Sequence, residues 1–173
     1  MGESRTLYEG RYLRICSVDG WEYVQRTRGV GAALIVAITG AREIVLVEQF
    51  RIPVNGRVIE LPAGLIGDID AADTDARAAA LRELHEETGY EATDLVPLMD
   101  GPSSQGLSSE MLSLFLATGL TRTGDGGGSD EGEEIEVHVV PLAVAPAWLE
   151  ARRAAGTLVD PRVYAGLFFA ERS

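Results

Sequence analysis

Apolar and polar residues alternate along the first part of the chain. The alternation runs on either side of Asp19-Gly20, a dipeptide that favours a tight turn, so Leu7–Ser17 and Trp21–Arg28 are predicted to form an antiparallel hairpin. An isolated hairpin is only marginally stable in water. We therefore expect this one to pack on the rest of the protein or on a second subunit.

The remainder of the chain carries several runs of β-branched and aliphatic residues, which are typical of strands. These strands are predicted at Val30–Ile38, Glu43–Phe50, Arg57–Leu61, Leu95–Met99, Met111–Thr118 and Glu134–Leu142. The segment Thr121–Gly132, with three consecutive glycines, is expected to be a mobile surface loop.

Three helices are predicted between and after these strands. The central helix should begin near residue 75, with Asp73 or Thr74 as its N-cap, and end at Thr88, because Gly89 suits the left-handed position past the last turn. The other two are expected at about 147–155 and from Asp160-Pro161 to Ala170. Strands before and after a central helix predict a mixed sheet between helices.

The central helix carries three carboxylates on one face. Glu83, Glu86 and Glu87 stand at positions i, i+3 and i+4, where like charges repel by a few tenths of a kcal/mol per pair. Acids in the last turns also oppose the helix macrodipole. The pattern indicates either a solvated acidic face or a site for a cation.

Composition narrows the class of protein. A chain of 173 residues, 46% of them hydrophobic, forms one sizeable core, so we expect a main domain at 29–173 with the hairpin at 1–28. The net charge of −12 argues against nucleic acid or an anionic membrane as the main partner. Cys16 has no partner for a disulfide, and no apolar run reaches the length of a membrane span, so we expect a cytoplasmic protein.

The wider sequence around the carboxylates resembles the signature of the Nudix hydrolases. The matching residues are Gly64 and the string Arg82-Glu83-Leu84-x-Glu86-Glu87-x-Gly89-Tyr90. One part departs from the family pattern, because Gly64 is four residues further from Arg82 than the pattern has, and Asp70 stands where a glutamate is expected. Asp68, Asp70 and Asp73 remain alternative replacements for that glutamate.

The resemblance implies an α/β/α sandwich with a mixed sheet. Three further stretches resemble the ADP-ribose pyrophosphatase branch of the family: residues 47–64, 133–137 and 160–164. The expected reaction is therefore Mg²⁺-dependent hydrolysis of ADP-ribose to AMP and ribose 5-phosphate, with Mn²⁺ as an alternative metal. The N-terminal hairpin resembles an arm that these enzymes exchange between the subunits of a homodimer.

The same resemblance implies the residues of the site. The metal ligands are expected to be Glu83, Glu86, Glu87 and the carbonyl of Ala63, which are the hard oxygen donors that Mg²⁺ prefers. Arg82 is expected to point away and anchor a neighbouring carboxylate or carbonyl. His85 and His138, the only histidines, are predicted to be structural.

Substrate-binding and catalytic residues are expected outside the signature. Tyr12 and Trp21 match aromatic residues that sandwich adenine, and Arg26 and Arg51 match positions that meet phosphate or ribose. Leu107 lies in a loop that resembles a segment of the same branch of the family, and this segment is expected to form the edge of the ribose pocket.

The general base is expected on the acidic segment after the glycine run. The candidates are Glu131 and Glu133, with Glu86 as the next choice. The alternatives to this function are hydrolysis of another nucleoside diphosphate sugar, a catalytically silent Nudix module that binds nucleotides, and an acidic interaction domain without a metal.

Overall fold

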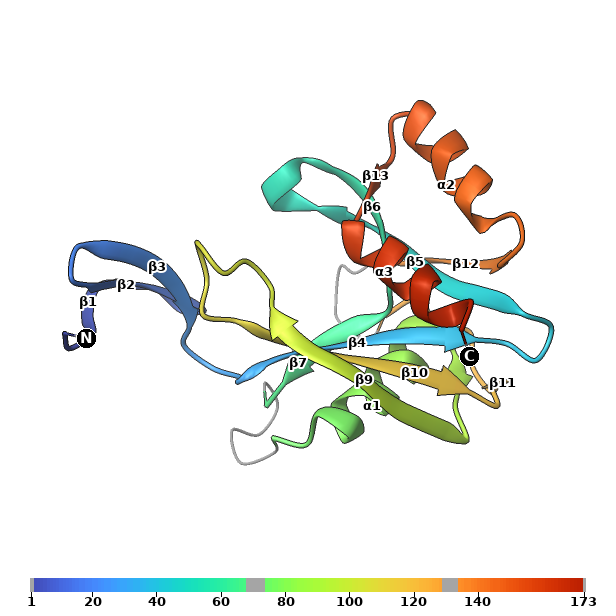
Figure 1. Ribbon diagram of the computed structural model, residues 1–173, viewed down its shortest axis with the longest axis horizontal. Helices are drawn as coiled ribbons and strands as arrows, with labels where there is room; N and C mark the ends of the chain where they lie inside the picture. Colours follow the sequence, from blue (N-terminus) through green and yellow to red (C-terminus); the bar gives the residue numbers. More distant parts are fainter. Residues whose placement is uncertain (1, 68–73, 129–133, 173) are drawn as a thin grey trace.

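The N-terminal part forms a small antiparallel sheet of three strands. The computed structural model describes residues 2–67, 74–128 and 134–172. The sheet contains β1 (Arg5–Glu9), β2 (Leu13–Val18) and β3 (Trp21–Arg26), and it extends from one end of the molecule (Figure 1). The turn at Asp19 and Gly20 has positive φ at both residues, 50° and 86°, which matches a type I′ hairpin. The predicted hairpin is confirmed, but the expected first strand is divided into two.

The main sheet is mixed, as predicted. Its central path runs β13-β6-β5-β4-β10-β9, with β12 paired to β5 and β7 paired to β4. The β4–β10 and β6–β13 pairs are parallel and the others are antiparallel. The strands are β4 (Gly31–Ile38), β5 (Glu43–Arg51), β6 (Gly56–Glu60), β7 (Ala63–Ile66), β9 (Asp94–Pro102), β10 (Met111–Thr118), β12 (Glu136–Pro141) and β13 (Leu158–Val159). A separate short pair joins β8 (Tyr90–Glu91) to β11 (Thr121–Arg122), and a 3₁₀ turn spans Ile52–Val54.

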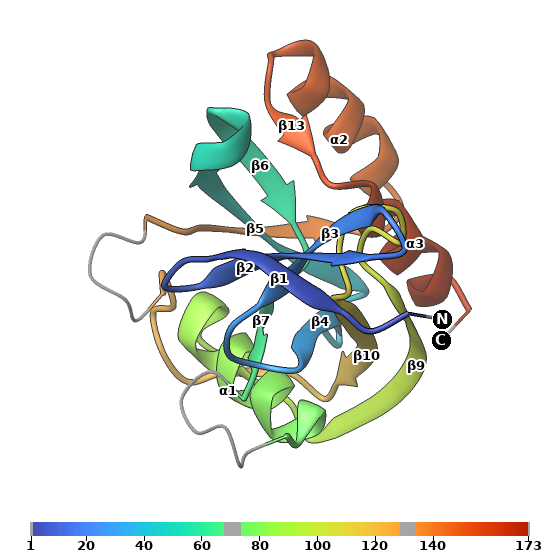
Figure 2. The same ribbon diagram turned by 90° about the vertical axis from the view of Figure 1, so that its left-hand side faces the viewer.

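Helices cover both faces of this sheet (Figures 1 and 2). The helix α1 (Ala76–Thr88) packs against the face that contributes Ala33, Ile35 and Val45 to one apolar cluster. The helices α2 (Ala145–Ala154) and α3 (Pro161–Ala170) pack against the opposite face. The two clusters explain why β4 and β5 are apolar at successive positions, because both of their faces are buried. This arrangement is the expected α/β/α sandwich.

The ends of α1 are fixed by local caps. Asp75, one residue beyond the two predicted caps, accepts hydrogen bonds from the backbone N–H groups of Arg77 and Ala78 at 2.9 and 3.3 Å. Gly89 has φ of 74° and donates its N–H to the His85 carbonyl, which confirms the predicted end of the helix.

The glycine segment after β11 differs from the prediction in its described part. The N–H groups of Gly127 and Gly128 donate to the carbonyls of Glu87 and Glu86 at 2.8 and 3.1 Å. These carbonyls belong to the last turn of α1, where no intrahelical donor is left for them. A Cβ on Gly126 would lie 2.5 Å from the backbone of Thr88, so only glycine permits this close approach. Residues 123–128 are therefore packed on the helix end; residues 129–132 lie outside the described part.

The N-terminal sheet is attached to the main sheet through the β9–β10 connection, beside β3 in Figures 1 and 2. The N–H of Val24 donates to the Leu107 carbonyl at 2.7 Å, and the N–H of Ser109 donates to the Val24 carbonyl at 3.1 Å. Cys16 is buried, as expected. Within the described ranges, no helix is long and apolar enough to cross a lipid bilayer.

Candidate active site

The three carboxylates of the central helix lie against β7. Glu87, 6% exposed, accepts a hydrogen bond from the backbone N–H of Ala63 at 2.9 Å through Oε2. Glu83 lies directly on Gly64, since a Cβ at that glycine would be 1.8 Å from the Glu83 carboxyl carbon. Gly64 is therefore required by the position of Glu83. The sequence did not predict β7, the strand that provides this contact.

Arg82 lies beside these carboxylates and does not point away from them. Its Nη1 is 2.8 Å from a carboxylate oxygen of Glu83 and 3.2 Å from one of Glu86. Two carboxylates that converge on one cationic nitrogen indicate a strongly negative local field. The predicted anchoring of a carboxylate by Arg82 is confirmed, but the carboxylates that it contacts are those of the signature itself.

The donor set fits a hard divalent cation. Glu83, Glu86 and Glu87 bring carboxylate oxygens from one face of α1, and the Ala63 carbonyl belongs to the strand that Glu87 contacts. Carboxylate and carbonyl oxygens are the ligands that Mg²⁺ prefers. Asp68, Asp70 and Asp73, the candidates for the missing signature glutamate, lie outside the described residues.

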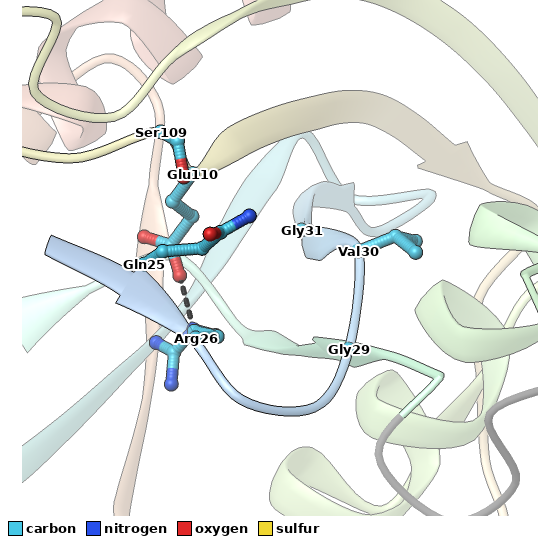
Figure 3. Close-up of a pocket in the computed structure, with 7 residues that line it drawn as sticks. All are labelled: Gln25, Arg26, Gly29, Val30, Gly31, Ser109 and Glu110. Carbon is cyan, nitrogen blue, oxygen red and sulfur yellow. Dashed lines mark hydrogen bonds and ion pairs between the residues drawn. The ribbon is translucent and has the colours of Figure 1, made fainter. Parts of the chain in front are cut away.

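The predicted phosphate- and ribose-binding arginines are each paired with an acid. Arg26 contacts Glu110 at 2.5 Å, and Arg51 contacts Glu60 at 2.7 Å. Figure 3 shows the contact between Arg26 and Glu110 in the lining of a cavity of about 260 Å³. Its lining is Gln25, Arg26, Gly29, Val30, Gly31, Ser109 and Glu110. Sequence reasoning missed Glu110 and Glu60, and no motif marks either residue.

The cavity adjoins the strand that carries Gly64. Val30 donates its N–H to the Ile66 carbonyl at 3.0 Å, and Gly31 pairs with Ile66 in the sheet. Two residues of β7 therefore separate the cavity from Gly64, which is roughly 7 Å at the usual rise of a strand. The cavity therefore lies near the strand against which Glu83 and Glu87 pack.

The two predicted adenine-binding aromatics lie at opposite ends of the β2–β3 hairpin. Trp21 pairs with Val18, whereas Tyr12 precedes the Leu13–Arg26 pair at the other end. Six residues along β2 correspond to about 20 Å. Tyr12 and Trp21 are 64% and 65% exposed, and Leu107 is 60% exposed. Within one chain the two rings therefore lie too far apart to stack on the two faces of one base.

The general-base candidates Glu131 and Glu133 fall outside the described residues. The residues on either side of them are placed: Gly128 is bonded to the Glu86 carbonyl, and Glu136 pairs with Glu48 at the start of β12. Glu86, the alternative base, contacts Arg82.

A second charged cluster surrounds Glu48, which is 2% exposed. Its carboxylate accepts hydrogen bonds from Arg57 at 2.7 Å, from His138 at 3.0 Å and from Arg152. Burial raises the pKa of Glu48, but these three hydrogen bonds outweigh burial and bring the pKa below its usual value. Glu136 lies near His138 and Arg57, so the cluster is balanced in charge.

Ligand atoms of Glu48, Glu136 and His138 lie within 4.8 Å of one another, close enough to share a metal ion. Two guanidinium groups, however, already supply positive charge at this point. We therefore interpret this group as an ion-pair cluster that joins α2 and β12 to β5, which agrees with the structural role predicted for His138.

Comparison with known proteins shows similarity to one family of hydrolases. Residues 27–159 match the NUDIX domain. A methanol dehydrogenase activator of Bacillus methanolicus is 36% identical over 73% of this chain, an ADP-ribose pyrophosphatase of Bacillus subtilis is 35% identical over 70%, and a GDP-mannose pyrophosphatase of Citrobacter koseri is 33% identical over 71%. The matched regions cover 66%, 64% and 65% of these relatives, which is slightly less than two thirds of their length.

The fold agrees with this match. The crystal structure of an ADP compounds hydrolase superposes with a TM-score of 0.73 at 23% identity, covering 98% of this chain and 90% of the other. The family match spans most of the described sheet and includes the carboxylates on α1 together with Ala63 and Gly64. The chain belongs to the Nudix hydrolase family.

Proposed function

We propose that this protein is a Mg²⁺-dependent pyrophosphohydrolase that cleaves ADP-ribose to AMP and ribose 5-phosphate, with Mn²⁺ as an alternative metal. The observation that supports it best is the packing of Glu83 and Glu87 against Gly64 and Ala63. A bound divalent cation neutralises charge on the diphosphate and lowers the pKa of bound water. Glu83, Glu86, Glu87 and the Ala63 carbonyl hold that cation.

Arg26, which lines the cavity, and Arg51 bind the anionic part of the substrate. Arg26 and Arg51 each use part of their five N–H donors on a carboxylate, and a planar guanidinium has further donors for phosphate oxygens. Leu107 lies on the connection that holds β3, close to Arg26 in the fold. It contributes an apolar contact to the edge of the ribose pocket.

The reaction is tested by a panel of substrates with saturating Mg²⁺. ADP-ribose is expected to give the highest kcat/KM among ADP-ribose, GDP-mannose, UDP-glucose, NADH and diadenosine polyphosphates. A clear preference for GDP-mannose would favour the second candidate, another nucleoside diphosphate sugar, which relatives named GDP-mannose pyrophosphatases support. Tight binding without turnover of any member would identify a silent nucleotide-binding module. Calorimetric titration with Mg²⁺ tests the last alternative, an acidic interaction domain, which would bind no metal.

We further propose that the protein is a homodimer in which the N-terminal sheet completes the site of the neighbouring subunit. The exposed rings Tyr12 and Trp21 lie about 20 Å apart in one chain, so two chains are needed to enclose one adenine. Tyr8, Leu13 and Ile15 occupy one exposed face of the same sheet, because Tyr8 pairs with Ile15 and Leu13 is two residues away on β2. A second copy of the chain covers such a face.

Deletion of residues 1–28 tests this dimer. The expected product is a monomer or an aggregate by light scattering, with loss of AMP binding, because the deletion removes both aromatics. A full-length protein with Trp21→Ala is the matched control, since it keeps the sheet and loses one ring; it should remain dimeric and bind AMP at least about fivefold more weakly. A stable truncated monomer with unchanged KM would exclude the exchanged arm.

The general base is proposed to be Glu131 or Glu133. The carboxylates of α1 are committed to the cation and to Arg82, so the group that activates water comes from another segment. Both glutamates stand between Gly128, bonded to the last turn of α1, and Glu136, paired with β5. The segment between Gly128 and Glu136 therefore starts at the last turn of α1, the turn that carries Glu86 and Glu87.

Glu131→Gln and Glu133→Gln should separate these two candidates. The base variant is expected to lower kcat by at least about tenfold with little change in KM, since a base acts only in the chemical step. The other variant serves as its control on the same segment. If both keep wild-type kcat under saturating Mg²⁺, Glu86 is the remaining candidate.

We also assign the protein to the cytoplasm. Cys16 is the only cysteine, and it is buried in the N-terminal sheet, so stability does not depend on an oxidising compartment. The expected substrates are small intracellular nucleotides. Nucleic acid and membranes are not proposed as partners.

A further inference from the structure

Three arginine–carboxylate pairs join residues at the ends of strands or at the start of α3. Two of them hold Arg26 and Arg51, the arginines assigned to the substrate. In each pair the acid is more buried than the arginine. The pairs are Arg26 with Glu110, Arg51 with Glu60, and Arg162 with Asp160, and the acids are 17%, 13% and 10% exposed.

The third pair stands at a helix end that disfavours a cation. Arg162 is in the first turn of α3, where the macrodipole is positive. Asp160 caps this helix by accepting a hydrogen bond from the backbone N–H of Arg162 at 2.8 Å. Both of its carboxylate oxygens also accept hydrogen bonds from the Arg162 guanidinium. The charge of Arg162 is therefore stabilised by carboxylates and not by the helix.

Two contacts bring this helix end to the substrate arginines. The short strand β13 runs beside β6 with Val159 opposite Ile59, and Asp160 donates its N–H to the Ile59 carbonyl at 2.9 Å. Glu60 is the next residue of β6. One turn after Arg162, a Cβ on Gly166 would lie 3.0 Å from Leu61, so α3 approaches the same part of the chain closely.

The electrostatic environment of Arg162 agrees with this placement. Its pKa is raised above the usual value chiefly by the hydrogen bonds to Asp160; burial opposes the rise, and the negative charges of Asp160, Glu60 and Glu110 add to it. The charges of Glu60 and Glu110 belong to the two substrate pairs. The contacts between β13 and β6 place the start of α3 next to the Arg51–Glu60 pair, although Arg162 contacts neither substrate arginine in the described structure.

We propose that Arg162 is a positioning residue for the Arg51–Glu60 pair and balances the carboxylates around Arg51. Together the two arginines Arg51 and Arg162 and the two acids Glu60 and Asp160 are neutral, whereas loss of Arg162 leaves one excess negative charge where a diphosphate has to bind. Arg51 is then drawn further onto these acids and away from the substrate. This inference rests on the proposed function, because it assumes an anionic substrate at Arg51.

Three variants test the proposal in the full-length protein. Arg162→Met keeps much of the apolar stem and removes the charge, so KM for ADP-ribose should rise at least about fivefold while kcat stays within about twofold. Arg162→Lys keeps the charge and should restore most of the affinity. Arg153→Met is the matched control, because Arg153 pairs with Glu150 on α2, outside this group, and its KM should equal that of the wild type.

A double-mutant cycle makes the test independent of turnover. Urea unfolding of Arg162→Met, Glu60→Gln and the double variant should show non-additive effects, because the two residues share one electrostatic group. Far-UV circular dichroism checks that each variant is folded. Additive effects, or a KM unchanged by Arg162→Met, would overturn the proposal. A wild-type protein inactive on ADP-ribose would refute the proposed function instead, and the cycle alone would then decide whether Arg162 balances the carboxylate of Glu60.

Discussion

Glu87→Gln should lower kcat for ADP-ribose by roughly 10²-fold or more, which is the scale of lost transition-state stabilisation. Glutamine has the size of glutamate, and its carbonyl oxygen can still accept the Ala63 N–H, so the contact between α1 and β7 is kept. The variant removes only the negative charge next to the cation. The expected loss therefore reflects metal binding and chemistry, not unfolding of the helix.

The measurement is steady-state hydrolysis of ADP-ribose across a Mg²⁺ titration, with thermal unfolding recorded for each protein. The matched control is Glu150→Gln, which removes the same charge from an exposed position on α2. It should keep wild-type kcat. A folded Glu87→Gln protein that retains more than about a third of the wild-type rate would show that Glu87 does not hold the cation.

The sequence predicts the central helix well because each of its determinants is local. The carboxylate spacing, the alanines before it and Gly89 after it all act within one or two turns. The N-cap is Asp75 and not one of the predicted residues, Asp73 or Thr74. Neighbouring Asp and Thr residues have similar N-cap propensities, so the sequence does not distinguish among them. Boundaries decided by equivalent neighbours are the least predictable part of a helix.

The features that were missed depend on contacts between distant segments. β7 is a strand of four residues whose pairing with β4 supplies its stability, so Ala63–Ile66 has little strand signal of its own. The glycine run after β11 indicates flexibility by composition, yet Gly126 is needed because its backbone lies against Thr88. Sequence composition does not report such close approaches.

The candidate site shows the same division. Glu83, Glu86 and Glu87 are found from one motif, whereas Glu110 and Glu60 are identified only by their ion pairs with Arg26 and Arg51. The aromatic residues were predicted as one sandwich because the sequence gives no distance between them. The hairpin register shows that Tyr12 and Trp21 lie at opposite ends of the β2–β3 hairpin.

Glu48→Gln should destabilise the protein by about 3 kcal/mol at pH 7, which corresponds to a decrease in Tm of roughly 6–12 °C. Glu48 is buried, and its carboxylate accepts hydrogen bonds from Arg57, His138 and Arg152. The uncharged amide removes the countercharge that both guanidiniums contact, leaves Arg57 with Glu136 at 3.7 Å, and turns its NH₂ group toward their donors. Glu150→Gln again serves as control, because the Glu150–Arg153 pair is exposed and should contribute little.

The difference between wild type and Glu48→Gln should also depend on pH, in a direction fixed by the lowered pKa of Glu48. A carboxyl whose pKa is lower in the folded state stabilises the protein above its unfolded pKa, near the usual value of 4.5, and this stability is lost as the pH falls through the folded value. Protonated Glu48 resembles glutamine in charge, so the gap in unfolding free energy should be largest near pH 7 and shrink below about pH 4.5. Urea unfolding of both proteins at several pH values measures this gap. A gap that stays constant down to pH 3, or one below about 0.5 kcal/mol at pH 7, would show that the charge of Glu48 does not hold α2 and β12 to the sheet.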